Sequence, residues 1–120
     1  MKKILIAEDE KPMAKALKLK LDNSGFEAQI ASNGQEAIDM LSKEKFDLVL
    51  LDLVMPKVDG FTVLETLKTK KINVPVIITS NLSQEEDAAK AKSLGAKDYL
   101  IKSNTPIAEI VDHVKKILKV

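Results

Sequence analysis

The sequence of 120 residues has no cysteine, no tryptophan and very few aromatic side chains. Without cysteine the chain can form no disulfide, no zinc–thiolate site and no cysteine nucleophile. The aromatic residues are only Phe26, Phe46, Phe61 and Tyr99, so the core must be aliphatic. Its 19 basic and 18 acidic residues leave a net charge of +1. That balance gives no electrostatic footprint for nucleic acid or for an anionic membrane.

Long hydrophobic runs are also missing. The apolar run at Ile4–Ala7 stops at Glu8 after four residues, whereas the apolar region of a signal peptide needs roughly 7 to 15. We therefore expect a cytoplasmic protein. The composition, 45% apolar and 31% charged, is typical of soluble globular proteins. A chain of this length fits one domain, and we predict a single domain over residues 1–120 with no output module.

Five short aliphatic runs are separated by segments of helical character. Continuous Val, Ile and Leu runs are typical of strands buried on both faces, and the predicted strands are 3–7, 26–31, 46–51, 74–79 and 96–101. Residues 13–21 are ambiguous, because they alternate like a strand while Met13, Leu17 and Leu21 repeat every four residues. Pro12 before them and Asn23-Ser24-Gly25 after them favour a helix.

The other four helices have start or stop signals of their own. Capping boxes are predicted at Asn33–Glu36 and Ser83–Glu86. Asp59-Gly60 precedes a third apolar helix face, and Thr105-Pro106 precedes the clearest amphipathic pattern in the chain. Strands alternating with helices predict right-handed βαβ units and a parallel sheet covered on both faces. The expected fold is a doubly wound, three-layer α/β sandwich.

Polar side chains follow four of the five predicted strands, at the point where each strand ends. They are Glu8 and Asp9 after the first strand, Asp52 after the third, Ser80 after the fourth and Lys102 after the fifth. The carboxyl ends of parallel strands meet at one edge of such a sheet, where ligands bind. We therefore predict that these residues lie together. In isolation, an aspartate such as Asp52 could equally be a turn former.

Three carboxylates at one place favour a bound cation, because neighbouring ionised carboxyl groups raise one another's pKa and a cation offsets their repulsion. The oxygen ligands, with no histidine or cysteine near them, favour Mg²⁺ over zinc. Magnesium can hold a phosphoryl group against an aspartate, with the Lys102 ammonium and the Ser80 hydroxyl on its other oxygens. Asp52 is therefore the candidate for the reacting group, since an aspartate can be phosphorylated as a carboxylate nucleophile. Glu10 and Asp59, by contrast, are interpreted as a helix start and a turn.

The same residues carry a resemblance to a known family. The four motifs are Glu8-Asp9, Leu51-Asp52 with Met55-Pro56-Lys57-Val58-Asp59-Gly60, Ser80, and Tyr99-Leu100-Ile101-Lys102. Each motif is weak alone, but their order and spacing are specific, and the whole chain resembles a response-regulator receiver domain of two-component signalling. Its single-domain form is similar to a chemotaxis regulator. The resemblance implies a flavodoxin-like (βα)5 fold with strand order 2-1-3-4-5.

The resemblance also implies an activity. Asp52 would accept a phosphoryl group from a histidine kinase or a histidine phosphotransfer protein. Mg²⁺ would be held by Asp9, Asp52, the main-chain carbonyl of Val54 and, through water, Glu8. The chain would not otherwise be an enzyme, since it would catalyse only its own phosphorylation and slow dephosphorylation.

The implied output is a change of one surface. Ser80 and Tyr99 would form a switch, with the hydroxyl moving toward the phosphoryl group and the ring turning inward behind it. The surface made by the helix at 83–94, the strand at 96–101 and the helix after Pro106 would bind a downstream effector. It could also form a weak homodimer of an otherwise monomeric chain. No direct contact with nucleic acid or membrane is expected.

Two residues depart from the family pattern. The lysine is usually followed by a proline in a cis peptide bond, but Ser103 follows Lys102 here, so the loop need not hold that isomer. Asn81 follows Ser80 where alanine is common, and its extra bulk is expected to narrow access to the site.

Val54 and Leu82 occupy the positions, two residues beyond Asp52 and Ser80, that tune hydrolysis in this family. Neither side chain can hydrogen-bond an attacking water, so we expect slow self-dephosphorylation.

Three other functions are possible on the same scaffold. Haloacid-dehalogenase phosphatases use a second aspartate two residues after the nucleophile, where this chain has Val54. A flavodoxin-like nucleotide or flavin binder would need a glycine-rich loop after the first strand and flanking aromatic residues, and the sequence has neither. The serious alternative is a receiver-like domain that acts as a constitutive protein-interaction module without phosphorylation.

Overall fold

The computed structural model describes residues 1–120 and contains one parallel sheet of five strands. The strand order β2-β1-β3-β4-β5 confirms the predicted doubly wound fold. The strands are β1 (Lys3–Ala7), β2 (Glu27–Ala31), β3 (Leu48–Leu51), β4 (Val76–Ser80) and β5 (Asp98–Ile101).

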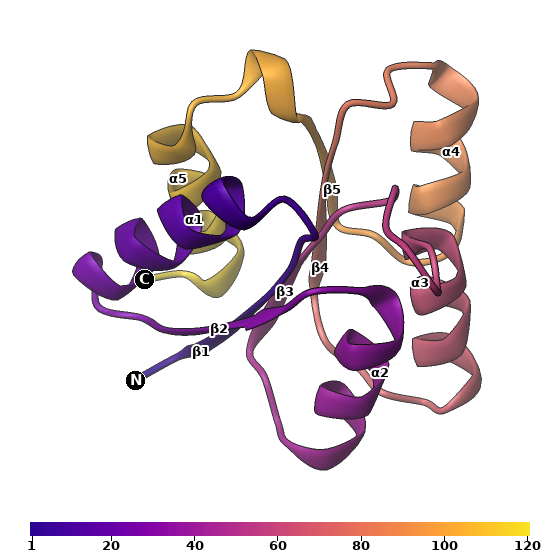
Figure 1. The fold of residues 1–120 in the computed structure, drawn as a ribbon, viewed down its shortest axis with the longest axis horizontal. Helices are drawn as coiled ribbons and strands as arrows, with labels where there is room; N and C mark the ends of the chain where they lie inside the picture. The colour runs from indigo at the N-terminus through magenta and orange to yellow at the C-terminus, as the bar shows by residue number, and fades with distance from the viewer.

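Helices cover both faces of the sheet. They are α1 (Lys11–Asn23), α2 (Gly34–Lys43), α3 (Gly60–Thr69), α4 (Glu85–Ser93) and α5 (Ile107–Leu118), with a short 3₁₀ turn η1 (Lys102–Asn104) before α5. Figure 1 shows α1 and α5 on one side of the sheet and α2, α3 and α4 on the other. The ambiguous segment 13–21 lies within α1, which confirms the helical interpretation.

The two faces of the sheet each support a separate aliphatic core. Leu5, Val49 and Ile78 pack on the α2–α4 side, whereas their chain neighbours Ile4 and Ile77 pack on the α1–α5 side. Alternate residues of one strand therefore enter opposite cores. This arrangement explains why the central strands β1, β3 and β4 are mostly Val, Ile and Leu, because every position on them after Lys3 is buried.

Helix starts follow the predictions only in part. Asn33 caps α2, since its Oδ1 accepts a hydrogen bond from the Glu36 N–H at 2.8 Å. The box predicted at Ser83–Glu86 is wrong: α4 begins at Glu85 without a side-chain cap. Its first turn instead carries three acidic residues, whose charges favour the positive end of the helix dipole.

The last helix begins one residue later than predicted. Pro106 is the N-cap of α5, in place of Thr105. The Thr105 hydroxyl donates instead to the Ile101 carbonyl at 2.8 Å and closes the turn η1. A hydroxyl used in that turn cannot also cap the helix.

The first residue of α3, Gly60, packs directly on the backbone that carries Asp52. A Cβ at Gly60 would lie 2.5 Å from the Asp52 carbonyl oxygen and 2.7 Å from the Leu53 Cα. Because neither main-chain atom can move without shifting the β3–α3 loop, we expect Gly60→Ala to lower the free energy of unfolding by about 1–3 kcal/mol. Urea denaturation measures this, with Glu65→Ala on the exposed side of α3 as the control. Equal stability of the two variants would contradict the packing argument.

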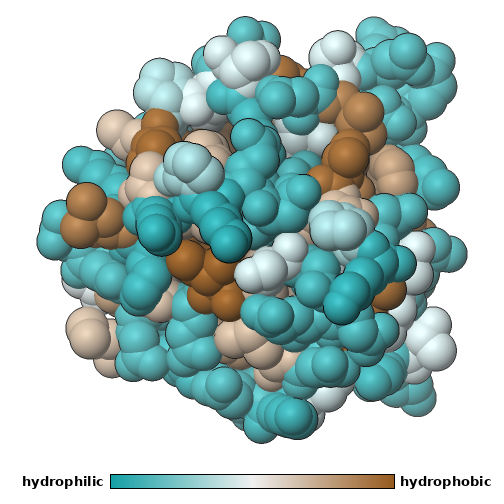
Figure 2. All heavy atoms as spheres, viewed as in Figure 1, coloured by the Kyte–Doolittle hydropathy of each residue, from teal (hydrophilic) through white to brown (hydrophobic).

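The surface is mostly hydrophilic. On the face seen in Figure 2, hydrophobic residues form small, separated groups among charged and polar side chains. The large hydrophobic residues that are exposed are Met1, Leu19, Val54 and Val120. No helix has the combination of length and apolar character that spanning a bilayer requires.

Candidate functional site

Strand register brings the predicted acids together. Ala7 pairs with Leu51 in the β1–β3 ladder, so Glu8 and Asp52 leave adjacent strands at the same level. The Asp52 N–H donates to the Ala7 carbonyl at 3.0 Å and fixes this alignment. The two side chains are buried, with residue exposures of 2% for Glu8 and 4% for Asp52. The sheet therefore presents two buried carboxylates side by side.

The Lys102 ammonium lies among three carboxylates. Its Nζ is 2.6 Å from Glu8 Oε1, 3.0 Å from Asp52 Oδ2 and 3.0 Å from Glu10 Oε1. The Lys102 side chain is only 8% exposed, whereas Glu10 is 61% exposed and closes the cluster from the solvent side. The predicted meeting of Glu8, Asp52 and Lys102 is observed in the structure. Glu10, which we interpreted only as a helix start, joins them.

Burial and charge change the protonation of this cluster. Burial raises the pKa of Glu8 to about 7, and the ion pair with Lys102 opposes that rise without cancelling it. For Lys102, burial alone would lower the pKa, but contacts with Glu8, Asp52 and Glu10 outweigh burial and raise it above its ordinary value. The lysine therefore stays charged, and Glu8 changes its charge near neutral pH.

The Glu8 carboxyl should make stability depend on pH. In the unfolded chain it loses its proton near 4.5, but in the folded chain it keeps it to about 7. The free energy of unfolding therefore falls between these pH values, by up to about 3 kcal/mol, because the unfolded chain binds fewer protons. Glu8→Gln, measured by urea denaturation in EDTA, should be more stable than the wild type at pH 8 and nearly equal to it at pH 4. Parallel pH profiles of the two proteins would contradict this expectation.

A cavity of about 310 Å³ opens beside Asp52. The residues that line it are Asp9, Glu10, Asp52, Val54, Asn81, Leu82 and Lys102. Asp9 is exposed and faces this space, but it is outside the group of carboxylates that lie closest together. The cavity gives a ligand access to the buried Asp52 carboxylate.

The acidic cluster fits a hard divalent cation. Glu8, Glu10 and Asp52 each offer a carboxylate oxygen, and these oxygens lie within 4.8 Å of one another. Glu8 Oε1 is buried and accepts no hydrogen bond, although it forms the ion pair with Lys102. Oxygen donors of this kind are those that Mg²⁺ prefers. The predicted roles of Asp9 and of the Val54 carbonyl as ligands stay predictions.

The two predicted switch residues lie at the ends of β4 and β5. Ser80 is fully buried, and its Oγ accepts a hydrogen bond from the Leu82 N–H at 3.1 Å. It does not line the cavity. Tyr99 packs against the α2–α4 core, and its hydroxyl donates to the Leu82 carbonyl at 2.7 Å. Burial, and then the charge of Asp87, raise the pKa of Tyr99, which keeps this donor protonated.

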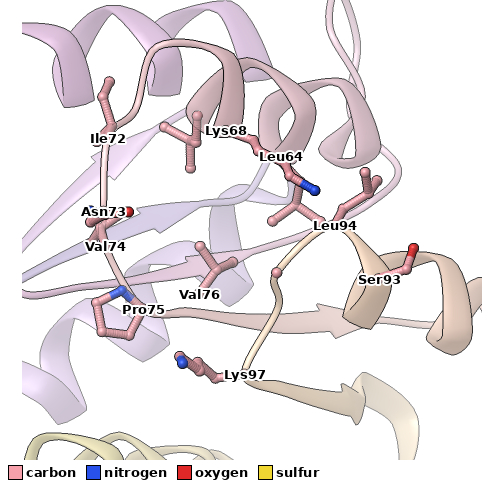
Figure 3. Close-up of a pocket in the computed structure, with 12 residues that line it drawn as sticks. Leu64, Lys68, Ile72, Asn73, Val74, Pro75, Val76, Ser93, Leu94 and Lys97 are labelled. Carbon is pink, nitrogen blue, oxygen red and sulfur yellow. The ribbon is translucent and has the colours of Figure 1, made fainter.

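A larger cavity lies at the opposite end of the strands. Figure 3 shows this space of about 460 Å³ between α3, α4 and the starts of β4 and β5, with Leu64, Pro75 and Leu94 among its walls. It contains no carboxylate and no residue of the cluster around Asp52. The acidic residues and Lys102 therefore lie at the smaller cavity and not at this one.

Comparison with known proteins agrees with this geometry. The family described as "Response regulator receiver domain" matches residues 4–115. The alkaline phosphatase synthesis transcriptional regulatory protein PhoP of Bacillus subtilis is 36% identical over 98% of this chain and 49% of its own length. The transcriptional regulatory protein PcoR of Escherichia coli is 33% identical over 99% of this chain and 52% of its own. The chain thus spans about half the length of these relatives.

Solved structures show the same fold. The receiver domain of the Francisella response regulator 1452 has a TM-score of 0.94 and 33% identity, covering 99% of this chain and 98% of that one. The response regulator TrrA of Thermotoga maritima, solved in complex with Mg²⁺-BeF, has a TM-score of 0.85 and 32% identity, covering 97% and 98%. The sequence match, the fold and the acidic cluster at the strand ends lead to one conclusion: this chain belongs to the response regulator receiver domains of two-component systems.

Proposed function

We propose that Asp52 is the phosphoacceptor of this receiver domain. The observation that carries the proposal is the contact between the buried Asp52 carboxylate and the Lys102 ammonium, 3.0 Å apart, at the wall of an open polar cavity. Asp52 Oδ1 also accepts the Val54 N–H at 3.2 Å, which fixes the orientation of the carboxylate. A buried carboxylate with a fixed orientation, next to the charged Lys102 ammonium, is suited to attack phosphorus.

The transfer step follows from these positions. An Asp52 carboxylate oxygen attacks the phosphorus of a phosphohistidine on a kinase or phosphotransfer protein. The new O–P bond forms while the P–N bond breaks, and the imidazole nitrogen keeps the electron pair and takes a proton. Lys102 balances the negative charge of Asp52 before transfer and that of the phosphoryl oxygens during transfer.

The acidic residues would hold the metal. We propose that Asp9, Asp52 and the Val54 carbonyl bind Mg²⁺ directly and that Glu8 binds it through water; Glu10 lies close enough to contribute. When bound, Mg²⁺ supplies a Lewis acid that neutralises charge on the transferred phosphoryl group. The relative from Thermotoga maritima, which was solved with Mg²⁺-BeF, supports this assignment.

The output would pass through the α4-β5-α5 surface. Tyr99 at β5 is bonded to Leu82 in the loop before α4, and Ser80 is bonded to the same residue. A Ser80 hydroxyl that turns toward a phosphoryl group would give up its contact with the Leu82 N–H and free the loop to move. We propose that a downstream effector, or a second copy of the domain, reads this change. A cytoplasmic location stays a prediction.

The direct test is uptake of a phosphoryl group from acetyl phosphate. We expect intact-mass spectrometry to show the gain of one phosphoryl group with Mg²⁺ and little or none with EDTA. A domain that binds its partner without phosphorylation would gain no mass under either condition. That outcome would reject the proposal and favour the constitutive interaction module.

The phosphorylated state is expected to last for many minutes or longer. Val54 and Leu82 both line the cavity, and neither side chain can orient a water toward phosphorus. We predict that Val54→Asn speeds loss of the phosphoryl group by about three- to tenfold, because its amide can hydrogen-bond the attacking water. The decay is followed by intact mass after removal of the donor, with Val120→Asn at an exposed terminal position as the control. Loss from the wild type within seconds, or equal decay of the Val54 variant, would refute it.

A further inference from the structure

The two residues that depart from the family pattern contact each other. Asn81 Oδ1 accepts a hydrogen bond from the Ser103 main-chain N–H at 3.0 Å. Asn81 directly follows Ser80, and Ser103 directly follows Lys102. The bond therefore joins the residue after the switch hydroxyl to the residue after the catalytic ammonium.

This contact continues the pairing of the two strands beyond the sheet. The β4–β5 ladder ends at the pair Ser80 and Ile101. Past that pair, no other hydrogen bond connects residues 81–84 with residues 102–106. The turn η1 is otherwise closed on itself, through the Thr105 hydroxyl and the Ile101 carbonyl. Asn81 thus makes the one hydrogen bond that connects the turn η1, which begins at Lys102, with the loop before α4.

The donor in this bond is the main-chain N–H of residue 103. Any residue except proline can supply it. The Ser103 side chain is exposed and makes no hydrogen bond, so the contact does not need its hydroxyl. A proline at 103 would have no N–H to donate. The contact therefore needs both features: an asparagine at 81 to accept the hydrogen bond and a residue other than proline at 103 to donate it.

We propose that Asn81 is a positioning residue that sets the place of Lys102 relative to Ser80 through the Ser103 N–H. The proposal rests on the phosphoacceptor function proposed for Asp52. Lys102 approaches Asp52 from a turn fixed by Asn81, so Asn81 acts on the phosphoryl transfer through Lys102. This role differs from the narrowing of access expected from its bulk, which predicts the opposite effect on rate.

A double-mutant cycle separates the two roles. Asn81→Ala and Ser103→Pro should each slow phosphorylation of Asp52 by acetyl phosphate about three- to tenfold, and the double variant should be no slower than the slower single variant. Ser103→Ala keeps the N–H and should behave as the wild type.

Other outcomes overturn the proposal. Faster phosphorylation of Asn81→Ala would show that the side chain obstructs the cavity. Additive losses in the double variant would show that Asn81 and Ser103 act independently. A Ser103→Ala variant as slow as Ser103→Pro would show that the hydroxyl, and not the main-chain N–H, matters.

Amide hydrogen exchange tests the contact without any phosphorylation. The Ser103 N–H should exchange several-fold more slowly in the wild type than in Asn81→Ala, while the amides of α5 exchange equally in both. Equal exchange at Ser103 would overturn the positioning role, whether or not Asp52 takes up phosphate. A protected Ser103 amide in a protein that gains no phosphoryl group would instead reject the proposed function alone.

Discussion

Replacing Asp52 with asparagine is expected to abolish phosphoryl uptake. The amide has nearly the shape of the carboxylate and can still accept the Val54 N–H, but its oxygen is far less nucleophilic. The neighbouring acid Glu8 is not expected to replace it, since it does not line the cavity that gives a ligand access to Asp52. Intact mass after incubation with acetyl phosphate and Mg²⁺ should show no gain for this variant.

Asp59→Asn is the matched control for this loss. Asp59 is exposed and caps α3, with its Oδ1 accepting the Thr62 N–H at 2.9 Å. Asparagine caps a helix about as well as aspartate, so this variant should gain mass as the wild type does. Uptake by the Asp52 variant at the rate of the control would mean that another residue is the acceptor.

Removing the Lys102 ammonium is expected to slow phosphorylation by about a hundredfold or more. This is the usual effect of removing one group that stabilises negative charge in a transition state. In Lys102→Met three carboxylates lose their only observed cation, and two of them, Glu8 and Asp52, are buried. Without Mg²⁺ the variant should therefore also lose about 3 kcal/mol of stability, since breaking a buried ion pair leaves charge unpaired. Added Mg²⁺ should recover part of that stability but not the rate.

The control for Lys102 is the exposed Lys97 just before β5. It lines the distant cavity and makes no ion pair, so Lys97→Met should keep the wild-type rate. The two variants are compared by initial rates of mass gain and by thermal melting with and without Mg²⁺. A Lys102 variant that is phosphorylated as fast as the Lys97 variant would show that the ammonium does not assist transfer.

The fold could be predicted from local patterns because each strand carries its own signal. Runs such as Leu48–Leu51 are apolar at every position, and alternate residues of the strand pack into the two opposite cores. The Asn33 cap was predictable for the same reason, since donor and acceptor lie three residues apart. Ser83 has an equally good local pattern, but the acidic first turn of α4 needs no cap there. A capping residue alone is therefore not enough to predict where a helix begins.

The site was predictable only as far as strand ends define it. Glu8, Asp52 and Lys102 each follow a strand, so the parallel sheet brings them together. Glu10 starts α1, and only the three-dimensional path of the Lys102 side chain shows that it completes the cluster. The Asn81–Ser103 bond spans 22 residues and uses a main-chain donor. No pattern of side chains in the sequence could indicate it.

Chemical trapping of the acyl phosphate tests the central claim most directly. Borohydride reduces an aspartyl phosphate to homoserine, and peptide mass spectrometry then identifies the residue that carried the phosphoryl group. After incubation with acetyl phosphate and Mg²⁺, we predict homoserine at position 52 and an unmodified carboxylate at Glu8, Asp9 and Glu10. Reduction at one of those three acids, or none at Asp52 in a protein that has gained a phosphoryl group, would contradict the assignment of Asp52 as the phosphoacceptor.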